Sequence, residues 1–351
     1  MIEVIENKKE WNKELELLKD VDFYHTYDYH HLSKNSNESA VLIKYTDGST
    51  SLFLPLLIRD IDNSIYKDAT SVYGYSGVLS LNMSDKFKTE EFYKELNVFF
   101  NDYKIISVFS RLHPFVNHQE AILSGLGTVA NLGKVVYIDL TDTIENQRKM
   151  FNKRMKSYLN ASRKSCTVIE SKLENHLQTF IKLYHENMKR VDADTNYFFE
   201  DSYFHQLLTS TDFSTKLYLC SHNETQQIIG GALFIEKGGM VQYHLSGYDE
   251  DYHDLNAIKL IIDEVRIRST QNNFIFLNLG GGRGSKEDSL FTFKKCFSKN
   301  TKQFKIWKYI VNEEVYGALV QKYLGSSLMT ESNEFFPAYR VKGISSKQQL
   351  H

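Results

Sequence analysis

Residues 277–297 read LNLGGGRGSKEDSLFTFKKCF, and this stretch combines several strong structural signals. A run of β-forming residues, FIFLNL at 274–279, stops abruptly at Gly280, where a glycine-rich loop begins. An acidic pair, Glu287 and Asp288, then opens a short amphipathic segment that ends in two lysines. The pattern predicts a strand, a glycine loop and a helix in succession. Such a turn lets a ligand approach backbone N–H groups closely.

Two nucleotide-binding motifs are excluded for this loop. A P-loop requires G-x-x-x-x-G-K-[ST], but Gly284 is followed by Ser285 and Lys286. A dinucleotide-binding loop requires G-x-G-x-x-G, and Gly280 and Gly282 would then need a glycine at position 285. The loop therefore predicts neither nucleotide hydrolysis nor NAD binding. A sharp turn without a ligand is the simpler alternative.

Length and composition are typical of a folded α/β protein. The chain has 351 residues, enough for two domains with their own cores. Its formal net charge of −2 argues against DNA as a partner and leaves anion binding to local patches. The three cysteines, Cys166, Cys220 and Cys296, form no C-x-x-C motif. We expect reduced thiols and no metal site.

The sequence contains no predicted membrane-spanning segment. The first residues, MIEVIENKKEW, lack an apolar region, and no run approaches the roughly 18 apolar residues of a spanning helix. We expect a cytoplasmic protein, with association at the inner face of a membrane left open. The polar residues 346–351 are expected to form a disordered tail.

Helix, β-hairpin, helix and strand are predicted twice along the chain. In the first half they cover 8–19, 40–45 with 51–59, 87–100 and 105–112. In the second half they cover 175–189, 228–236 with 240–246, 255–269 and 274–279, and a last strand is predicted at 305–311. The repetition predicts two similar α/β domains, 1–130 and 131–345, with a boundary in the glycine-containing segment 125–134.

The segment 147–164, QRKMFNKRMKSYLNASRK, is strongly basic and contains no acidic residue. Its helical spacing makes Arg154 and Tyr158 neighbours on adjacent turns. One interpretation is a solvated helix face. The other is a clamp for a phosphorylated ligand, because a guanidinium pairs bidentately with phosphate. The spacing leaves both open.

Several short motifs occur in a characteristic order. They are YGYSG at 73–77, SRLHP at 110–114, YIDL at 137–140 before the basic segment, GGA at 230–232, YHLSG at 243–247 and the stretch 277–294. Together, over about residues 20–340, they resemble the FemAB family (FemA, FemB and FemX) of non-ribosomal peptidyltransferases, a branch of the GNAT-like acyltransferases.

The resemblance implies an α/β fold of two tandem GNAT-like domains packed around an inter-domain cleft. It also implies an acyltransferase or aminoacyltransferase that forms an amide on a phosphate-bearing cell-envelope precursor. Such a precursor is a peptidoglycan intermediate, a nucleotide sugar for surface polysaccharide or a lipid-linked relative. No bound cofactor is expected. The co-substrate is aminoacyl-tRNA or acyl-CoA.

The resemblance assigns roles to particular residues. Arg154 and Tyr158 match the pair that binds the diphosphate of the precursor. Phe293 and Lys294 match the pair beside the aminoacyl end, where Lys294 would neutralise a tRNA phosphate or a developing oxyanion. His113 stands where many members have an acidic residue before proline, so the resemblance implies either that His113 acts as a base or that the acceptor differs.

Further substrate-binding residues are expected from the same motifs. The aromatic members would line the cleft, and the glycines would let donor and acceptor approach the backbone. These expected residues are Tyr73, Tyr75, Arg111, Tyr243, Gly281, Gly282 and Arg283.

Two departures from the family leave the donor open. The segment 167–219 has room for two ordinary helices, not for the long helical hairpin thought to help with tRNA. The segment 248–254, YDEDYHD, is acidic where GNAT enzymes place a glycine-rich turn, and it would repel the CoA pyrophosphate. Two alternatives therefore stand beside the transferase. One is a non-catalytic module that binds a nucleotide sugar or tRNA. The other is an RNA-binding protein with basic patches at 147–164 and 294–308.

Overall fold

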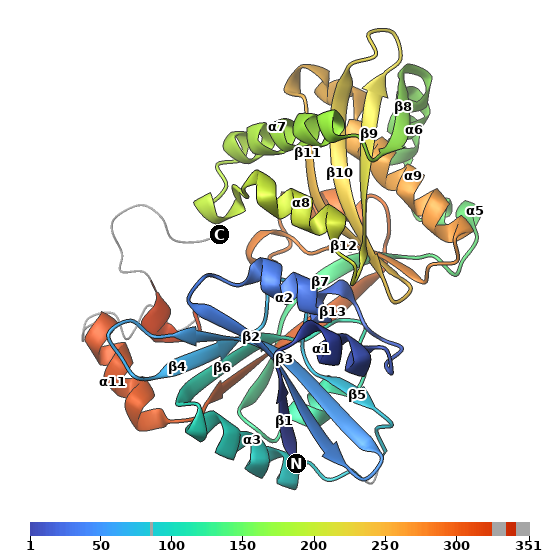
Figure 1. Cartoon of the computed structure of the whole chain (residues 1–351). Coiled ribbons are helices and arrows are strands. Elements are labelled where there is room, and N and C mark those ends of the chain that lie inside the picture. The colour runs from blue at the N-terminus through green and yellow to red at the C-terminus, as the bar shows by residue number, and fades with distance from the viewer. Residues whose placement is uncertain (85–86, 325–334, 342–351) are drawn as a thin grey trace. The chain divides into compact units, whose positions relative to one another are not determined.

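The computed structural model describes residues 1–84, 87–324 and 335–341. The expected tail, 346–351, lies outside these residues. The chain divides into two compact units. Unit 1 comprises Met1–Leu132 and Gln303–Leu350, and unit 2 comprises Gly133–Lys302. Figure 1 labels the helices and strands of both units.

Unit 1 is built on a mixed sheet with the strand order β1-β2-β3-β4-β6-β13, and β5 pairs with β3. The strands are β1 (Ile2–Ile5), β2 (Glu38–Asp47), β3 (Thr50–Asp60), β4 (Lys67–Thr70), β5 (Leu79–Leu81), β6 (Ile105–Arg111) and β13 (Thr301–Ile310). Strands β1 to β4 are antiparallel neighbours, whereas β4 and β6 run parallel. The predicted hairpin at Asp47 and Gly48 is confirmed, because Asp47 pairs with Thr50 and Gly48 has a φ of 57°.

Helices cover the sheet of unit 1 with apolar side chains. They are α1 (Lys8–Leu15), α2 (Tyr27–Ser33), α3 (Glu90–Asp102), α4 (Gln119–Leu123) and α11 (Glu313–Leu324). Helix α3 buries Phe92, Leu96 and Phe100 in a core that also contains Val41 of β2 and Trp307 of β13. The core of unit 1 therefore includes a strand that lies near the end of the chain.

The strands of unit 2 pair in the order β7-β12-β11-β10-β9-β8 and run in mixed directions. The strands are β7 (Thr128–Asp139), β8 (Cys166–Ser171), β9 (Ser214–His222), β10 (Ile228–Lys237), β11 (Met240–Tyr248) and β12 (Phe276–Gly280). Strands β8 to β11 are antiparallel, β11 and β12 are parallel, and β12 is antiparallel to β7. The helices are α5 (Ile144–Lys149), α6 (Lys153–Ser165), α7 (Glu174–Arg190), α8 (Asp201–Thr209), α9 (Ala257–Gln271) and α10 (Ser289–Lys295).

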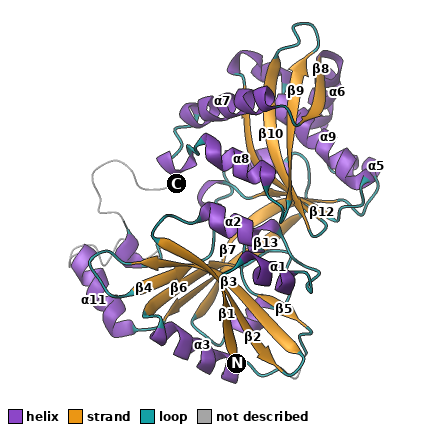
Figure 2. Cartoon of the chain, viewed as in Figure 1, coloured by secondary structure: helices purple, strands orange, loops and turns teal. Residues whose placement is uncertain are grey.

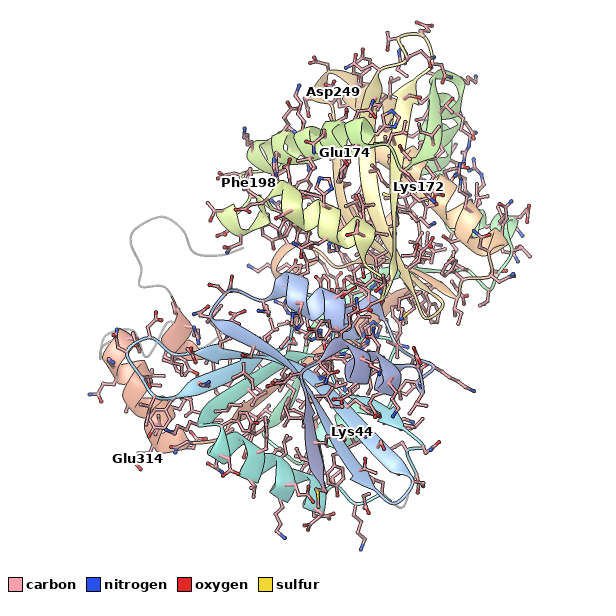
Figure 3. The ribbon with its side chains drawn as sticks, viewed as in Figure 1. Lys44, Lys172, Glu174, Phe198, Asp249 and Glu314 are labelled. Atoms are coloured by element: carbon pink, nitrogen blue, oxygen red, sulfur yellow. The ribbon has the colours of Figure 1, made fainter. Side chains whose placement is uncertain are left out.

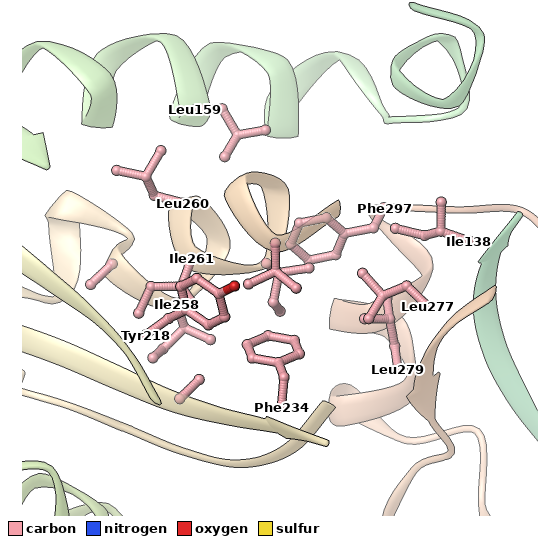
Figure 4. Packing of buried hydrophobic residues seen from close by; sticks show 14 of the residues in the cluster. Ile138, Leu159, Tyr218, Phe234, Ile258, Leu260, Ile261, Leu277, Leu279 and Phe297 are labelled. Atoms are coloured by element: carbon pink, nitrogen blue, oxygen red, sulfur yellow. The ribbon is translucent and has the colours of Figure 1, made fainter. Parts of the chain in front are cut away.

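Two layers of helices enclose the sheet of unit 2. Helices α7 and α8 lie on one face, and α6 and α9 lie on the other, as Figures 1 and 2 show. Figure 4 shows the core under α6 and α9, where Leu277 and Leu279 of β12 lie near Ile261 and Phe297. Charged side chains such as Lys172 and Glu174 lie on the outside of this unit (Figure 3).

The two halves of the chain repeat the same order of elements but exchange their last strands. Strand β7 follows β6 in the sequence, yet it pairs with β12, where Ile138 lies opposite Leu277. Strand β13 follows β12, yet it pairs with β6, where Trp307 lies opposite Ser110. The division therefore differs from the expected domains 1–130 and 131–345, because unit 2 ends at Lys302. The expected boundary segment, 125–134, contains the start of β7.

Glycines in two of the sequence motifs allow helices to approach the sheet of unit 2. A Cβ atom on Gly247 of β11 would lie 2.5 Å from the backbone of Leu183 in α7. A Cβ atom on Gly230 of β10 would lie 2.7 Å from the Cβ of Ala257 in α9. These glycines in the GGA and YHLSG motifs therefore serve helix–sheet packing.

We expect Gly247→Ala to destabilise the protein by about 1–3 kcal/mol, because the new methyl group would force α7 away from β11. Urea unfolding followed by circular dichroism measures the change. Gly317→Ala in α11 is the matched control, since its Cβ would meet nothing within 4 Å. Alanine there should be neutral or stabilise the helix by up to about 1 kcal/mol. Equal stability of both variants would contradict the close approach.

Candidate active site

The parallel strands β11 and β12 form a fork in unit 2. They pair at three positions only, from Met240 opposite Phe276 to Gln242 opposite Asn278. Strand β11 then continues to Tyr248 and pairs only with β10. A ligand with an amide backbone can hydrogen-bond to such an open strand edge. Ligands of α/β folds commonly bind at the carboxyl ends of diverging parallel strands.

A β-bulge lies in β11 just beyond the last position paired with β12. Leu233 of β10 pairs with Leu245 and Phe234 pairs with Tyr243, so His244 is the extra residue. A bulge interrupts the ladder and bends the strand. Burial lowers the pKa of His244 to about 4, so its ring is neutral at pH 7. The bulge thus helps β11 to turn away from β12.

Lys294 lies at the end of β12, where the predicted glycine loop begins. It belongs to α10 and is only 7% exposed. Its Nζ donates a hydrogen bond to the carbonyl oxygen of Gly281 at 2.6 Å. Burial lowers the pKa of Lys294 to about 8, and only the charge of Asp288 opposes this shift. The structure therefore places beside the fork a lysine whose pKa is about 8, close to neutral pH.

The glycine loop is closed by Asp288. Its Oδ1 accepts a hydrogen bond from the backbone N–H of Phe291 at 3.0 Å and so caps α10. Its Oδ2 accepts from the backbone N–H of Arg283 at 3.3 Å and from the Nε at 3.2 Å. Burial by itself raises the pKa of Asp288, but these hydrogen bonds outweigh it and lower the pKa. The helix start already has its own anion, which argues against a phosphate there.

Two aromatic residues predicted for the site pack against the core of unit 2. Phe293 is partly buried and meets Phe297 edge-on, with 5.7 Å between the ring centroids. The hydroxyl of Tyr243 forms a hydrogen bond with Ser246, and burial raises its pKa to about 12. Both rings lie close to the fork, and Tyr243 remains a neutral phenol in this setting.

The predicted neighbours Arg154 and Tyr158 are in contact on α6. Arg154 Nε donates a hydrogen bond to the Tyr158 hydroxyl, and its guanidinium lies 5.3 Å from the centre of the ring. Lys259 of α9 lies on the same ring, with its Nζ 4.2 Å from the centre. Burial, together with the charge of Arg154, lowers the pKa of Lys259. In the described part of the chain neither cation has an acidic partner, so this cluster can accept an anion.

Other cations of the basic segment have a structural role. The segment forms two helices, α5 and α6, and not one. The buried carboxylate of Asp263 accepts from Arg266 at 2.8 Å and from Arg163 at 2.5 Å. Arg148 lies 3.5 Å away, and Arg266 also donates to Gln147 at 2.7 Å. Arg148 and Arg163 therefore help to hold α5, α6 and α9 together, a role that neither interpretation of the segment included. The phosphate clamp at Arg154 and Tyr158 stays a prediction.

Three residues predicted to bind substrate lie close together in unit 1. The guanidinium of Arg111, at the end of β6, lies 5.6 Å from the centre of the Tyr73 ring. Its Nε is buried and has no hydrogen-bond partner within residues 1–84, 87–324 and 335–341, and Tyr73 is 62% exposed. Tyr75 packs edge-on against Phe304, with 4.9 Å between centroids. An exposed aromatic ring, that of Tyr73, and the partly buried guanidinium of Arg111 therefore lie together at the end of β6.

His113 has a structural environment in unit 1. It is 2% exposed, and its Nε2 lies 2.9 Å from Oδ2 of the fully buried Asp22. Its Nδ1 accepts from the backbone N–H of Phe115 at 3.2 Å, which assigns the proton to Nε2. Neither ring nitrogen is free to accept a proton from a substrate. The geometry favours a role in holding the SRLHP turn over the expected role as a base.

Two residues near these groups were not predicted as site residues: Lys259 lies outside the sequence motifs, and Asn278 lies within one of them. Lys259 joins the Arg154 cluster from α9, and Asn278 occupies the last paired position of the fork. The partly apolar pattern of α9 indicates only a helix with a buried face. The FIFLNL run indicates only a strand, although an asparagine within a buried strand is an unusual choice.

The two departures from the family are present in the structure. The acidic loop forms a short 3-10 turn, Glu250–Leu255, directly before α9. Between β8 and β9 the structure has α7 and α8, which are ordinary helices. Within residues 1–84, 87–324 and 335–341, no helix is long and apolar enough to cross a membrane, and no group of His, Cys, Asp and Glu is arranged to hold a metal.

The burial of Lys294 predicts a pH-dependent effect on stability. Its pKa is about 8 in the folded chain and 10.5 ordinarily, so the unfolded chain binds more protons between these values. The free-energy cost of burying the charged Lys294 side chain is therefore fully present below pH 8 and disappears as pH rises to about 10.5. We expect Lys294→Met to be about 1–3 kcal/mol more stable than wild type at pH 7, with a smaller difference at pH 10.

Urea unfolding at the two pH values measures this difference. Lys295→Met is the matched control, because Lys295 is the exposed neighbour in the same helix. It should change stability little and equally at both pH values. A Lys294→Met effect that is independent of pH would contradict the buried position.

Known proteins share this fold and part of this sequence. The FemAB family model matches residues 216–305, which include the fork, the glycine loop and α10. No curated protein sequence matches the chain. The structure of FemX superimposes with a TM-score of 0.70 at 14% identity, covering 90% of this chain and 99% of that one.

Two further structures share the architecture. A conserved protein of unknown function from Bacteroides thetaiotaomicron has a TM-score of 0.57 at 10% identity, covering 88% of this chain and all of that one. A tandem GNAT protein from the clavulanic acid biosynthesis pathway has a TM-score of 0.50 at 8% identity, covering 89% and 99%. These findings support a transferase. They confirm the predicted resemblance: the chain is FemAB-like in sequence over residues 216–305 and has the α/β fold of FemX and tandem GNAT proteins.

Proposed function

We propose that the chain is an N-acyltransferase or aminoacyltransferase that forms an amide on a phosphate-bearing precursor of the cell envelope. The acceptor class is a peptidoglycan intermediate or a nucleotide sugar for surface polysaccharide. One observation carries the proposal. The segment that matches the FemAB family contains the β11–β12 fork, and Lys294 lies at the end of β12 with its Nζ on the Gly281 carbonyl.

The chemistry requires an activated carbonyl and an amine. The carbonyl of the donor would lie in the fork, where the edge of β11 offers backbone hydrogen bonds beyond Gln242. When the amine attacks, negative charge develops on the carbonyl oxygen. A partly buried cation stabilises that charge more strongly than it would in water, because the local dielectric constant is low. Lys294 can supply this stabilisation from its protonated form.

Positioning of the two substrates would supply much of the acceleration. Effective molarities in oriented reactions correspond to about 7–11 kcal/mol of the barrier. The cations Arg154 and Lys259, which both contact the Tyr158 ring, would hold the phosphate groups of the acceptor. The proposed mechanism involves no metal and no covalent enzyme intermediate.

The donor in this proposal is aminoacyl-tRNA or acyl-CoA. The acidic turn before α9 disfavours the pyrophosphate of CoA. The ordinary helices α7 and α8 contain no long hairpin for tRNA. Both donors are cytoplasmic metabolites, so we place the reaction in the cytoplasm. A lipid-linked acceptor would lie at the inner face of the membrane.

Transfer is tested by incubating the protein with a mixture of charged tRNAs or with a set of acyl-CoA thioesters, each with a panel of UDP-sugar acceptors. Mass spectrometry of the acceptor detects the amide. We expect a mass increase that corresponds to one aminoacyl or acyl group. Tight binding of an acceptor in calorimetry without any transfer would instead identify a binding module.

Lys294→Ala should abolish transfer while the chain stays folded, because it removes the cation beside the fork. Lys295→Ala, which changes the exposed neighbour, should retain activity. Near-normal transfer by Lys294→Ala would remove the glycine-loop region from the mechanism. Circular dichroism of both variants checks the fold.

Arg154→Ala and Lys259→Ala should each weaken binding of a UDP-sugar acceptor by about tenfold or more, because each removes a charge-assisted contact to phosphate. Isothermal titration calorimetry measures the affinity. Lys164→Ala is the matched control, since this exposed lysine lies at the other end of α6. Equal affinities in all three variants would place the acceptor elsewhere.

A further inference from the structure

Asn278 occupies a special position in the fork of unit 2. It is the last residue of β12 that pairs with β11, and its side chain is 1% exposed. Its neighbours Leu277 and Leu279 point into the core under α9, as Figure 4 shows. Because side chains alternate along a strand, Asn278 points to the opposite face of the sheet. It lies there beside Gln242 of β11.

One end of the Asn278 amide is held in place. Its Oδ1 accepts the backbone N–H of Gly280 at 2.9 Å. This hydrogen bond leans the side chain along β12 towards the end where the two strands have separated. It also fixes which end of the amide is oxygen, because a backbone N–H needs an acceptor. The NH2 group must therefore be the other end.

The Nδ2 atom of Asn278 is buried and has no hydrogen-bond partner among the described residues. An unsatisfied buried donor costs about 1–3 kcal/mol. Leucine or valine in this strand would avoid that cost. A buried unpaired donor in a folded protein calls for an explanation, such as a ligand group that accepts its hydrogen bond.

The side chain of Lys294 reaches the end of β12 from α10. Its Nζ lies 3.2 Å from the position that a Cβ on Gly280 would occupy, and one of its hydrogens is used by the Gly281 carbonyl. Gly280 has a φ of 77°, so another residue there would be strained and would crowd the ammonium group. The amide of Asn278 thus bonds to Gly280, and the ammonium of Lys294 bonds to the next residue, Gly281.

We propose that Asn278 Nδ2 is a hydrogen-bond donor to the carbonyl oxygen of the acyl donor, and that it acts together with Lys294. The inference rests on the proposed transferase function. The amine nitrogen of the acceptor bonds to the carbonyl carbon, and the C=O π electrons move to the oxygen. The Asn278 N–H and the Lys294 cation stabilise this oxyanion. The C=O bond then re-forms, and the ester oxygen or thioester sulfur leaves with the electrons of its bond to carbon. The amine loses one proton, and the leaving oxygen or sulfur gains one.

Asn278→Asp tests the assignment, because it keeps an acceptor for the Gly280 N–H and removes the donor. The loss of one oxyanion donor lowers kcat about 10²- to 10³-fold in acyl transfer. We expect a loss of that size, with the KM of the donor changed less than about threefold. Separate assays with charged tRNAs and with acyl-CoA thioesters distinguish an ester from a thioester donor.

Asn278→Thr provides a second variant without a buried charge. Threonine suits a strand and offers an oxygen to Gly280, but its side chain is too short to reach the carbonyl. Asn272→Asp is the matched control, because Asn272 is exposed at the end of α9 in the same unit. The control should keep wild-type kcat, and thermal melts establish that each variant is folded.

The possible outcomes separate the two proposals. Transfer by wild type together with a kcat loss in both Asn278 variants supports the inference. Transfer by wild type with kcat within about threefold in either folded variant overturns it, and the amide then bonds to water. Transfer by neither wild type nor variants overturns the transferase function and the inference with it.

Discussion

The pairing of β7 with β12 is the constraint on which the candidate site depends. Strand β12 has only three paired positions with β11, so that side alone does not hold its end. On the other side β7 pairs with it from Phe276 to Gly280. The paired residues of β7, Val136–Asp139, stand at the start of unit 2 in the sequence, far from β12. Strand β13 follows β12, yet it returns to β6 and buries Trp307 in unit 1.

The site combines groups that the fold keeps at a cost. Lys294 is buried with a lowered pKa, and Asn278 has a buried amide nitrogen that finds no partner in the described part of the chain. Both lie where β12 ends, since Asn278 bonds to Gly280 and Lys294 bonds to Gly281. A fold rarely keeps such groups for stability, because apolar side chains would pack there more favourably. Their position in the segment that matches the FemAB family supports a role in substrate chemistry.

Local patterns were sufficient for most of the predicted elements. The hairpin at Asp47, helix α7 and the run of strands β9 to β11 follow from turn residues and from hydrophobic periodicity. The contact between Arg154 and Tyr158 also follows from their spacing on one helix. The role of His113 did not follow, because the burial of its partner Asp22 depends on residues far along the chain.

The sequence by itself determined the elements, their repeated order and the glycine-rich exit from β12, since each depends on residues within a few positions of one another. Only the tertiary structure decided which edge each last strand joins, because either half offers a backbone edge for pairing. It alone brought Lys259 of α9 to Tyr158 of α6. It alone also left the Asn278 amide nitrogen without a partner among the described residues, because hydrogen-bond satisfaction depends on every group that folding brings near it.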